Sequence, residues 1–245
     1  MAFDWDPEWE EEDPDDRTPP VKVWVPPERD HVYTVGVDTA EGLGHGDNAC
    51  LQVLDTVSGE QCAVYCGRLP PDLLGSVAGR LGWAYNGALL VVEANNHGLV
   101  TISILRRLGY KSLFRRRVTN RVFNRVTEEF GFKTTRTTKP TIINGLDEGL
   151  RNGELVIHEA ETITECIGYV RDERGVMGGS PFDDRVMALA LAHYGRQFLH
   201  LREPERPKRD EYGTGKWWRS LLSQDSGLEG KMVVGRHIRR RGSPV

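Results

Sequence analysis

Acidic residues end two apolar segments of the chain, and a further pair opens a helix-like one. Asp38 follows the apolar run in HVYTVGVD, Glu93 follows ALLVV, and Asp183 and Asp184 begin DDRVMALALAHYG. Carboxylates that converge in one cleft repel each other, and a divalent cation removes that repulsion. Oxygen ligands of this kind suit Mg²⁺ or Mn²⁺. The pattern therefore favours a site in which three or four carboxylates hold two ions and phosphodiester bonds are hydrolysed.

Each acid also has an ordinary structural explanation. Asp38 would cap the turn that follows it, Glu93 would complement the dipole of the next helix, and either Asp183 or Asp184 would serve as a helix N-cap. One Asp suffices for an N-cap, so the doubled acid and the joint occurrence favour a metal site. Asp47, in the Gly-rich turn EGLGHGD, is an additional ligand candidate. The phosphate-loop pattern G-x-x-x-x-G-K-[ST] is absent from this turn and from the whole sequence.

The elements that must position these acids are expected to form a mixed sheet with flanking helices. Apolar runs predict strands at residues 31–38, 49–56, 60–67 and 88–93, with weaker candidates at 111–115 and in GELVIHE. Helical spacing predicts helices at residues 71–86, 97–108, 140–149, 160–171 and 183–199. Residues 116–138 are polar and basic and are expected to form a long loop. This order of elements predicts an α/β fold.

Charge is distributed unevenly along the 245 residues, although the net charge is only −4. Residues 1–30 hold eleven acidic residues against three basic ones, and residues 201–245 hold eleven basic against six acidic. We therefore expect an acidic, Pro-rich leader at 1–28, one globular domain at 29–200 and a basic tail at 201–245. The four cysteines form no C-x-x-C pair, which favours reduced thiols and a cytoplasmic setting. No apolar run reaches the roughly 18–20 residues of a membrane span.

Basic residues between the second and third acidic positions are candidates for contact with a polyanion. Arg115, Arg116 and Arg117 are consecutive, with Arg121 close by and Lys139 in the run TTRTTKP. Arg and Lys side chains bind nucleic-acid phosphates without reading the base sequence. A solvated charged surface is the alternative explanation. The sequence thus predicts DNA contacts at these five residues.

Four stretches together resemble the nuclease domain of the large terminase subunits of tailed bacteriophages. The run YTVGVDTAEGLGHGDNACLQVLDTVSGEQCAVYCG resembles the start of that domain, and ALLVVEANNHGLVTISILRRLGY resembles its second acidic motif. GGSPFDDRVMALALA is similar to the third acidic motif, and TTRTTKPTIINGLDEGLRNGELVIHE lies between them in matching order. The resemblance covers roughly residues 22–200.

The resemblance implies a ribonuclease H-like fold and a two-metal endonuclease that cuts double-stranded DNA, with little sequence preference, during genome packaging. It assigns Asp38, Glu93, Asp183 and Asp184 as ligands of two Mg²⁺ or Mn²⁺ ions, with Asp184 favoured over Asp183 as the closer ligand. It also implies a terminase ATPase domain or subunit, a portal protein and a small terminase subunit as partners, in the host cytoplasm. No membrane partner is expected.

Two departures from the family's pattern leave alternatives open. Many relatives have His before the paired acids, where this chain has Phe182, and the family's ATPase domain has no counterpart in the sequence. The chain would then be an excised domain or a separately encoded nuclease subunit, with the acidic leader as a docking segment for the motor. Two other functions stay open: a Holliday-junction resolvase-like nuclease, and a non-catalytic module that binds DNA or docks on the motor.

Overall fold

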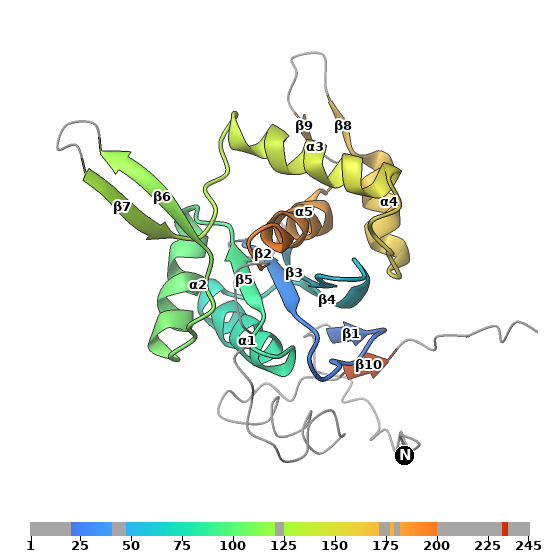
Figure 1. Cartoon of the computed structure of the whole chain (residues 1–245), viewed down its shortest axis with the longest axis horizontal. Helices are drawn as coiled ribbons and strands as arrows, with labels where there is room; N and C mark the ends of the chain where they lie inside the picture. Colours follow the sequence, from blue (N-terminus) through green and yellow to red (C-terminus); the bar gives the residue numbers. More distant parts are fainter. Residues whose placement is uncertain are drawn as a thin grey trace, which may run out of the picture.

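A mixed sheet of six strands forms the centre of the molecule, in the order β10-β1-β4-β3-β2-β5 (Figure 1). The structure is a computed structural model that describes residues 21–40, 48–120, 125–171, 177–178, 182–199 and 232–234. Neighbouring strands are antiparallel except for the parallel pairs β2–β5 and β1–β10. The strands are β1 (Val21–Val23), β2 (Tyr33–Asp38), β3 (Ala49–Asp55), β4 (Gln61–Gly67), β5 (Leu89–Val92) and β10 (Met232–Val234).

Helices cover both faces of this sheet, which explains why its central strands are apolar throughout. Every residue of β2, β3 and β5 is buried, as expected of strands covered on both faces. The helices are α1 (Pro71–Ala84), α2 (Asn96–Arg107), α3 (Thr138–Arg151), α4 (Ala160–Gly168) and α5 (Asp184–Arg196). None of the helices within the described ranges is long and apolar enough to cross a bilayer. The α/β fold with a mixed sheet and helices on both faces is therefore confirmed.

Alternate residues of each strand contribute to one of two hydrophobic cores. Leu90 and Val92 of β5 pack in the core that α1 and α2 cover, which also contains Leu74 and Leu105. Leu89 and Val91 pack in the opposite core, together with buried residues of α3 and α5. Because side chains alternate across a strand, an unbroken apolar run such as LLVV supplies both cores at once. Figure 1 shows α5 lying against the sheet over β2 and β3.

The contact between β2 and α5 is unusually close because residue 36 is glycine. A Cβ atom on Gly36 would lie 1.8 Å from the carbonyl oxygen of Ala188 and 2.5 Å from the amide nitrogen of Ala192. On the same face of β2, the Thr34 hydroxyl donates a hydrogen bond to the carbonyl oxygen of Ala192 (2.9 Å). The backbones of the helix and the strand are therefore in direct contact, two residues before Asp38.

A two-stranded hairpin occupies the region that the sequence predicts to be a loop, so that prediction is wrong. Strand β6 (Arg115–Asn120) pairs with β7 (Arg125–Phe130), and both project from the body of the molecule beyond α2 (Figure 1). Phe130 at the end of β7 packs against the core that α1 and α2 cover, but the rest of the hairpin has no apolar alternation, which is the signal that a strand assignment depends on. Cross-strand pairs of Arg and Glu take the place of apolar contacts: Arg115 with Glu128, and Arg116 with Glu129.

Two further strand predictions are wrong, and two strands of the sheet, β1 and β10, lie outside the predicted domain. Of residues 111–115, only Leu113 pairs with the central sheet, through an isolated bridge to Leu90, and Arg115 belongs to β6; GELVIHE contributes only the bridge between Val156 and Glu60. Strand β1, within the expected leader, pairs with β4, and Val23 is 2% exposed. This pairing favours a domain that begins before residue 29, although the predicted boundaries stay predictions. The small strands β8 (Val170–Arg171) and β9 (Met177–Gly178) form a separate pair.

Candidate active site

Two of the predicted acids lie at adjacent strand ends. Asp38 is the last residue of β2, and Glu93 directly follows β5. These strands are parallel neighbours, and the Glu93 amide donates a hydrogen bond to the carbonyl oxygen of Val37 (2.9 Å). The carboxyl ends of parallel strands meet at one edge of a sheet, which is where α/β proteins place their sites.

The first turn of α5 brings the other two acids to the same edge. Asp183 is the N-cap residue of α5 and Asp184 is its first helical residue. The backbone amide of Asn48, which directly precedes β3, donates a hydrogen bond to the Asp184 carboxylate (3.0 Å). The close contact at Gly36 fixes α5 against β2 and so sets where this first turn lies.

All four predicted acids line one open cleft of about 180 Å³. Asp38, Glu93 and Asp184 are 9%, 8% and 5% exposed, so their carboxylates are largely removed from water. The other lining residues are polar with one exception, a methionine of α5. They are Thr39, Asn48, Thr134, Lys139 and Met187.

The carboxylates interact strongly with one another. Burial raises the pKa of the Asp38 carboxyl well above its ordinary value, and the charge of Glu93 and a hydrogen bond with it raise that pKa further. The charges of Asp184 and then Asp183 act in the same direction. Acids separated by 55 and 91 residues in the sequence therefore share one electrostatic environment.

Each acid also has a partner within the protein. The Asn95 side-chain amide donates to Glu93 (2.8 Å), and Lys139 donates to Asp183 (2.9 Å), in addition to the Asn48 contact of Asp184. Within the described residues, no group of three or more His, Cys, Asp and Glu side chains is already arranged around one point as metal ligands.

Lys139 is the cationic member of the cleft lining. Its ammonium group is partly buried, which by itself lowers the pKa, but the hydrogen bond to Asp183 and the charge of that residue leave the pKa raised. Lys139 comes from the first turn of α3, which packs beside α5. The sequence predicts Lys139 as a DNA contact, and the structure places it directly beside an acid of the cleft.

The donor set of the cleft fits a hard divalent cation. Three buried carboxylates with only partial compensation by one lysine leave excess negative charge, and oxygen ligands are those that Mg²⁺ and Mn²⁺ prefer. Two cleft hydroxyls, Thr39 Oγ1 and Thr134 Oγ1, are buried and have no hydrogen-bond partner among the described residues. Buried hydroxyls without a partner are costly, and a ligand or a water bound in the cleft would satisfy them.

Sequence reasoning missed several residues around the cleft. Thr39 directly follows Asp38 and Asn48 directly follows Asp47, so nearness in sequence to the predicted acids is the signal that could have found them. Asn95 is the N-cap residue of α2 but makes no side-chain cap hydrogen bond there; its side-chain NH2 group donates to Glu93. Asp47 and Arg121 lie outside the described residues.

The predicted DNA-binding arginines lie on the hairpin. Arg115 and Arg117 are exposed on β6, whereas Arg116 is 25% exposed and pairs with Glu129. The Arg115 guanidinium lies 4.6 Å from the centre of the Phe130 ring and 3.4 Å from Glu128. The end of the hairpin is linked to the cleft, because the Phe132 amide donates to Val92 and its carbonyl accepts from the Ala94 amide, on either side of Glu93.

Strand order, helix placement and the converging acids together define a ribonuclease H-like fold. Solved structures with this fold include the large terminase nuclease from thermophilic phage G20c with bound magnesium, at a TM-score of 0.55 and 21% identity, over 70% of this chain and 85% of that chain. The same nuclease with bound cobalt gives a TM-score of 0.52 and 21% identity, over 70% and 92% of the two chains.

At this level of identity the likeness is one of fold. It confirms that the chain has the architecture of a large terminase nuclease domain, as the sequence resemblance predicts. No family model matches the sequence, and no curated protein matches it significantly.

Proposed function

We propose that the protein is a metal-dependent endonuclease that cuts double-stranded DNA during phage genome packaging. The convergence of Asp38, Glu93, Asp183 and Asp184 on one cleft of a ribonuclease H-like fold is the observation that supports this function. A magnesium-bound and a cobalt-bound large terminase nuclease of similar fold support dependence on a divalent cation.

Asp38, Glu93 and Asp184 would hold two Mg²⁺ or Mn²⁺ ions, with Asp183 as a further ligand once it separates from Lys139. Bound ions of this kind activate water for attack on phosphorus and stabilise the charge of the departing 3′ oxygen. The protein's own contribution is to hold the carboxylates at fixed strand and helix ends and to shield them from water. Asn95 orients Glu93, and the amide of Asn48 orients Asp184.

The substrate in this proposal is duplex DNA bound without base recognition. Arg115 and Arg117 of the hairpin, with Arg116, Arg121 and Lys139, would contact backbone phosphates, which take Arg and Lys irrespective of sequence. Low sequence specificity follows from such contacts. A terminase ATPase domain or subunit, a portal protein and a small terminase subunit are the proposed partners, and host cytoplasm is the proposed location.

Plasmid digestion with Mn²⁺, with Mg²⁺ and with a chelator tests the proposal. Asp38→Asn, Glu93→Gln and Asp184→Asn should each lower the cleavage rate at least ~100-fold, since loss of a group that merely supports a metal ligand already costs about 10–100-fold. Each change keeps side-chain size, so circular dichroism and the melting temperature should show an intact fold.

The control variant is Asp72→Asn, which alters an exposed acid of α1 that does not line the cleft and should cut at the wild-type rate. Wild-type cleavage by Asp38→Asn or Glu93→Gln would contradict the site assignment. Preference for a four-way junction over linear duplex would favour the resolvase-like alternative. DNA binding without metal-stimulated cutting would favour the non-catalytic module.

A further inference from the structure

The first turn of α5 is capped by a residue from another helix. Asp183 occupies the N-cap position but makes no side-chain cap hydrogen bond. The backbone amide of Arg185 instead donates to Glu165 Oε2 of α4 at 3.0 Å. Helix N-termini leave their first amides without intrahelical partners, and a carboxylate that accepts from them also complements the positive end of the helix dipole. Glu165 of α4 therefore accepts the hydrogen bond that the side chain of an N-cap Asp in α5 would ordinarily accept.

The same carboxylate also holds the Arg185 side chain. Arg185 Nη1 donates to Glu165 Oε1 (2.8 Å), while its Nε donates to Glu159 Oε2 (3.1 Å). Glu159 is 1% exposed, and the Arg185 side chain is 19% exposed. Charge-assisted hydrogen bonds at a buried site are stronger than neutral ones and fix geometry more tightly. Arg185 directly follows Asp184, so its backbone position fixes that of the acid.

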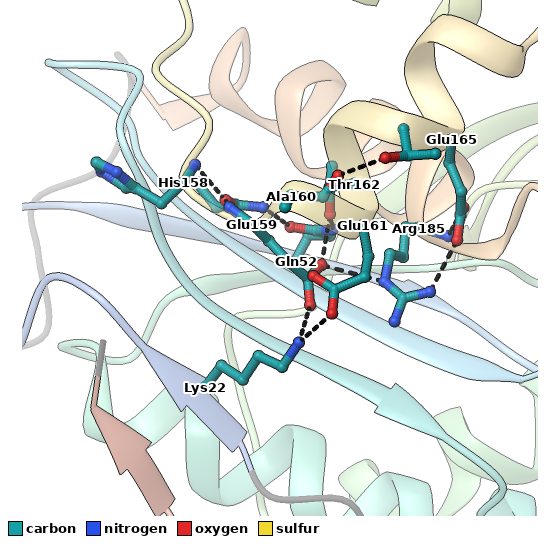
Figure 2. A network of polar contacts seen from close by, with 11 residues as sticks. Lys22, Gln52, His158, Glu159, Ala160, Glu161, Thr162, Glu165 and Arg185 are labelled. Atoms are coloured by element: carbon teal, nitrogen blue, oxygen red, sulfur yellow. Dashed lines mark hydrogen bonds and ion pairs between the residues drawn. The ribbon is translucent and has the colours of Figure 1, made fainter. Parts of the chain in front are cut away.

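Further polar contacts anchor Glu159 to the sheet, as Figure 2 shows. Lys22 of β1 donates to Glu159 Oε1 (3.1 Å), and the Thr162 hydroxyl donates to Glu159 Oε2 (2.6 Å). The backbone amide of Glu159 donates to Gln61 Oε1 of β4 (2.7 Å). The network therefore runs from two strands of the sheet through α4 to the start of α5.

We propose that Glu165, acting through Arg185, is a positioning residue for the acids at the start of α5. Because α4 supplies the cap, neither Asp183 nor Asp184 has to turn back onto its own helix. Asp184 accepts from Asn48 and Asp183 accepts from Lys139, both within the cleft. This inference rests on the proposed function, in which these two acids hold metal.

A network that only stabilised the packing of α4 and α5 would have a different effect. Its loss would lower the melting temperature and leave the metal affinity of the folded protein unchanged. A positioning role requires that metal affinity falls in protein that is still folded. Exchange of the backbone amides in the first turn of α5, measured without metal, reports the cap itself.

The experiment compares wild type with Glu165→Ala and Glu165→Gln. Glu165→Ala should weaken Mn²⁺ binding, measured by calorimetry, by roughly tenfold, the lower end of the effect seen when a partner of a metal ligand is removed. In the metal-free variant, amide exchange at residues 184–186 should be faster. The kcat for plasmid cleavage should fall, with little change in the KM for DNA. Glu165→Gln keeps an oxygen that accepts from the Arg185 amide, so it should recover part of both losses.

Glu161→Ala is the matched control, since it removes a carboxylate of the same helix that bonds Lys22 (3.0 Å). It should leave Mn²⁺ affinity and amide exchange in α5 unchanged. Wild-type Mn²⁺ affinity and exchange in Glu165→Ala, or an equal loss in Glu161→Ala, would overturn the inference. Failure of wild-type protein to bind Mn²⁺ would instead overturn the proposed function, while the metal-free exchange rates would still decide whether Glu165 caps α5.

Discussion

The two acids at the start of α5 are not equivalent, although they are adjacent in sequence. Asp184 is 5% exposed and accepts a backbone hydrogen bond inside the cleft. The Asp183 side chain is 28% exposed and forms an ion pair with Lys139, whose side chain is 25% exposed. Asp184 is the more deeply buried of the two, whereas Asp183 is held by Lys139, which favours Asp184 as the closer ligand. Lys139 balances part of the negative charge of the cleft through Asp183.

Another titrating pair, at the opposite end of β2 from the cleft, predicts a pH dependence of stability. The hydrogen bond that His31 Nδ1 donates to the Asp55 carboxylate raises the pKa of His31 above its usual value; burial opposes this, and the charges of Asp55, Glu28 and Asp30 add to it. The folded pKa thus exceeds the unfolded one, so the stabilisation is complete below the unfolded pKa of about 6.5 and is lost as pH rises through the folded pKa.

Urea unfolding of wild type and His31→Gln at a series of pH values checks this prediction. The difference in free energy of unfolding should favour wild type near pH ~5.5 and shrink toward pH ~8.5. Subtracting the variant removes the contributions of other groups, such as His193, whose pKa is lowered chiefly by burial. A difference that grows with pH would contradict the assignment.

At the scale of elements, the packing of α5 on β2 depends on the missing side chain of Gly36. Gly36→Ala would push a methyl group into the backbone of Ala188 and force the helix away from the strand. We expect a loss of about 1–3 kcal/mol in the free energy of unfolding, as for other overpacked cores. Urea denaturation measures this loss, and metal affinity should fall with it because Asp184 moves away from Asp38.

Gly145→Ala is the appropriate comparison for that variant. Gly145 lies inside α3, and a Cβ atom there would have nothing within 4 Å. Alanine is favoured over glycine in a helix interior by roughly 0.5–1 kcal/mol, so this variant should be slightly more stable than wild type. Equal destabilisation by both substitutions would show that the contact at Gly36 is not the cause.

At the scale of the whole molecule, the hairpin extends the basic surface beyond the cleft. Arg115 and Arg117 are both exposed on β6, and the chain leads from β7 directly to the backbone around Glu93 (Figure 1). A duplex bound at the cleft and on the hairpin would place two additional phosphates against these arginines. The slope of log affinity against log salt concentration is about −0.9 for each phosphate contact. Replacing both arginines by Gln removes two contacts and should therefore make this slope less negative by about 1.8.

Fluorescence anisotropy with a labelled duplex, in chelator and over a range of salt concentrations, measures that slope. Arg151→Gln is the control, since Arg151 is an exposed arginine at the end of α3 that pairs with Asp147 (2.9 Å). It should leave the slope unchanged. A double variant of Arg115 and Arg117 with the wild-type slope would exclude the hairpin from the DNA contact.

The sequence predicted best those features that depend on local pattern. Apolar runs gave β2, β3, β4 and β5 within a residue or two, and the acids at two strand ends lie where those runs place them. The cleft could be predicted because the acids that line it lie at the ends of two strands and at the start of a helix. The prediction that Asp38 and Asp184 lie close together also required the resemblance to a known family, since no local sequence pattern relates residues so far apart.

Features that depend on tertiary contact could not be predicted in this way. Strands β6 and β7 lack apolar alternation and are held by Arg–Glu pairs across the hairpin. The pairing of β1 with β4 joins segments about 40 residues apart, and the cap from Glu165 reaches α5 from another helix. For β1 and for the start of α5 the stabilising partner comes from another element, and in the hairpin it is a charged side chain, so apolar periodicity carries no signal for any of them.

The contact at Gly36 has a consequence for how the protein tolerates change. Gly36 lies two positions before Asp38 and touches Ala188, four positions after Asp184. The distance between the Asp38 and Asp184 carboxylates is thus set by contact between main-chain atoms, whose size no substitution alters. A change in the size of a leucine or valine elsewhere in the interior should therefore alter the distance between Asp38 and Asp184 less than any side chain placed at residue 36.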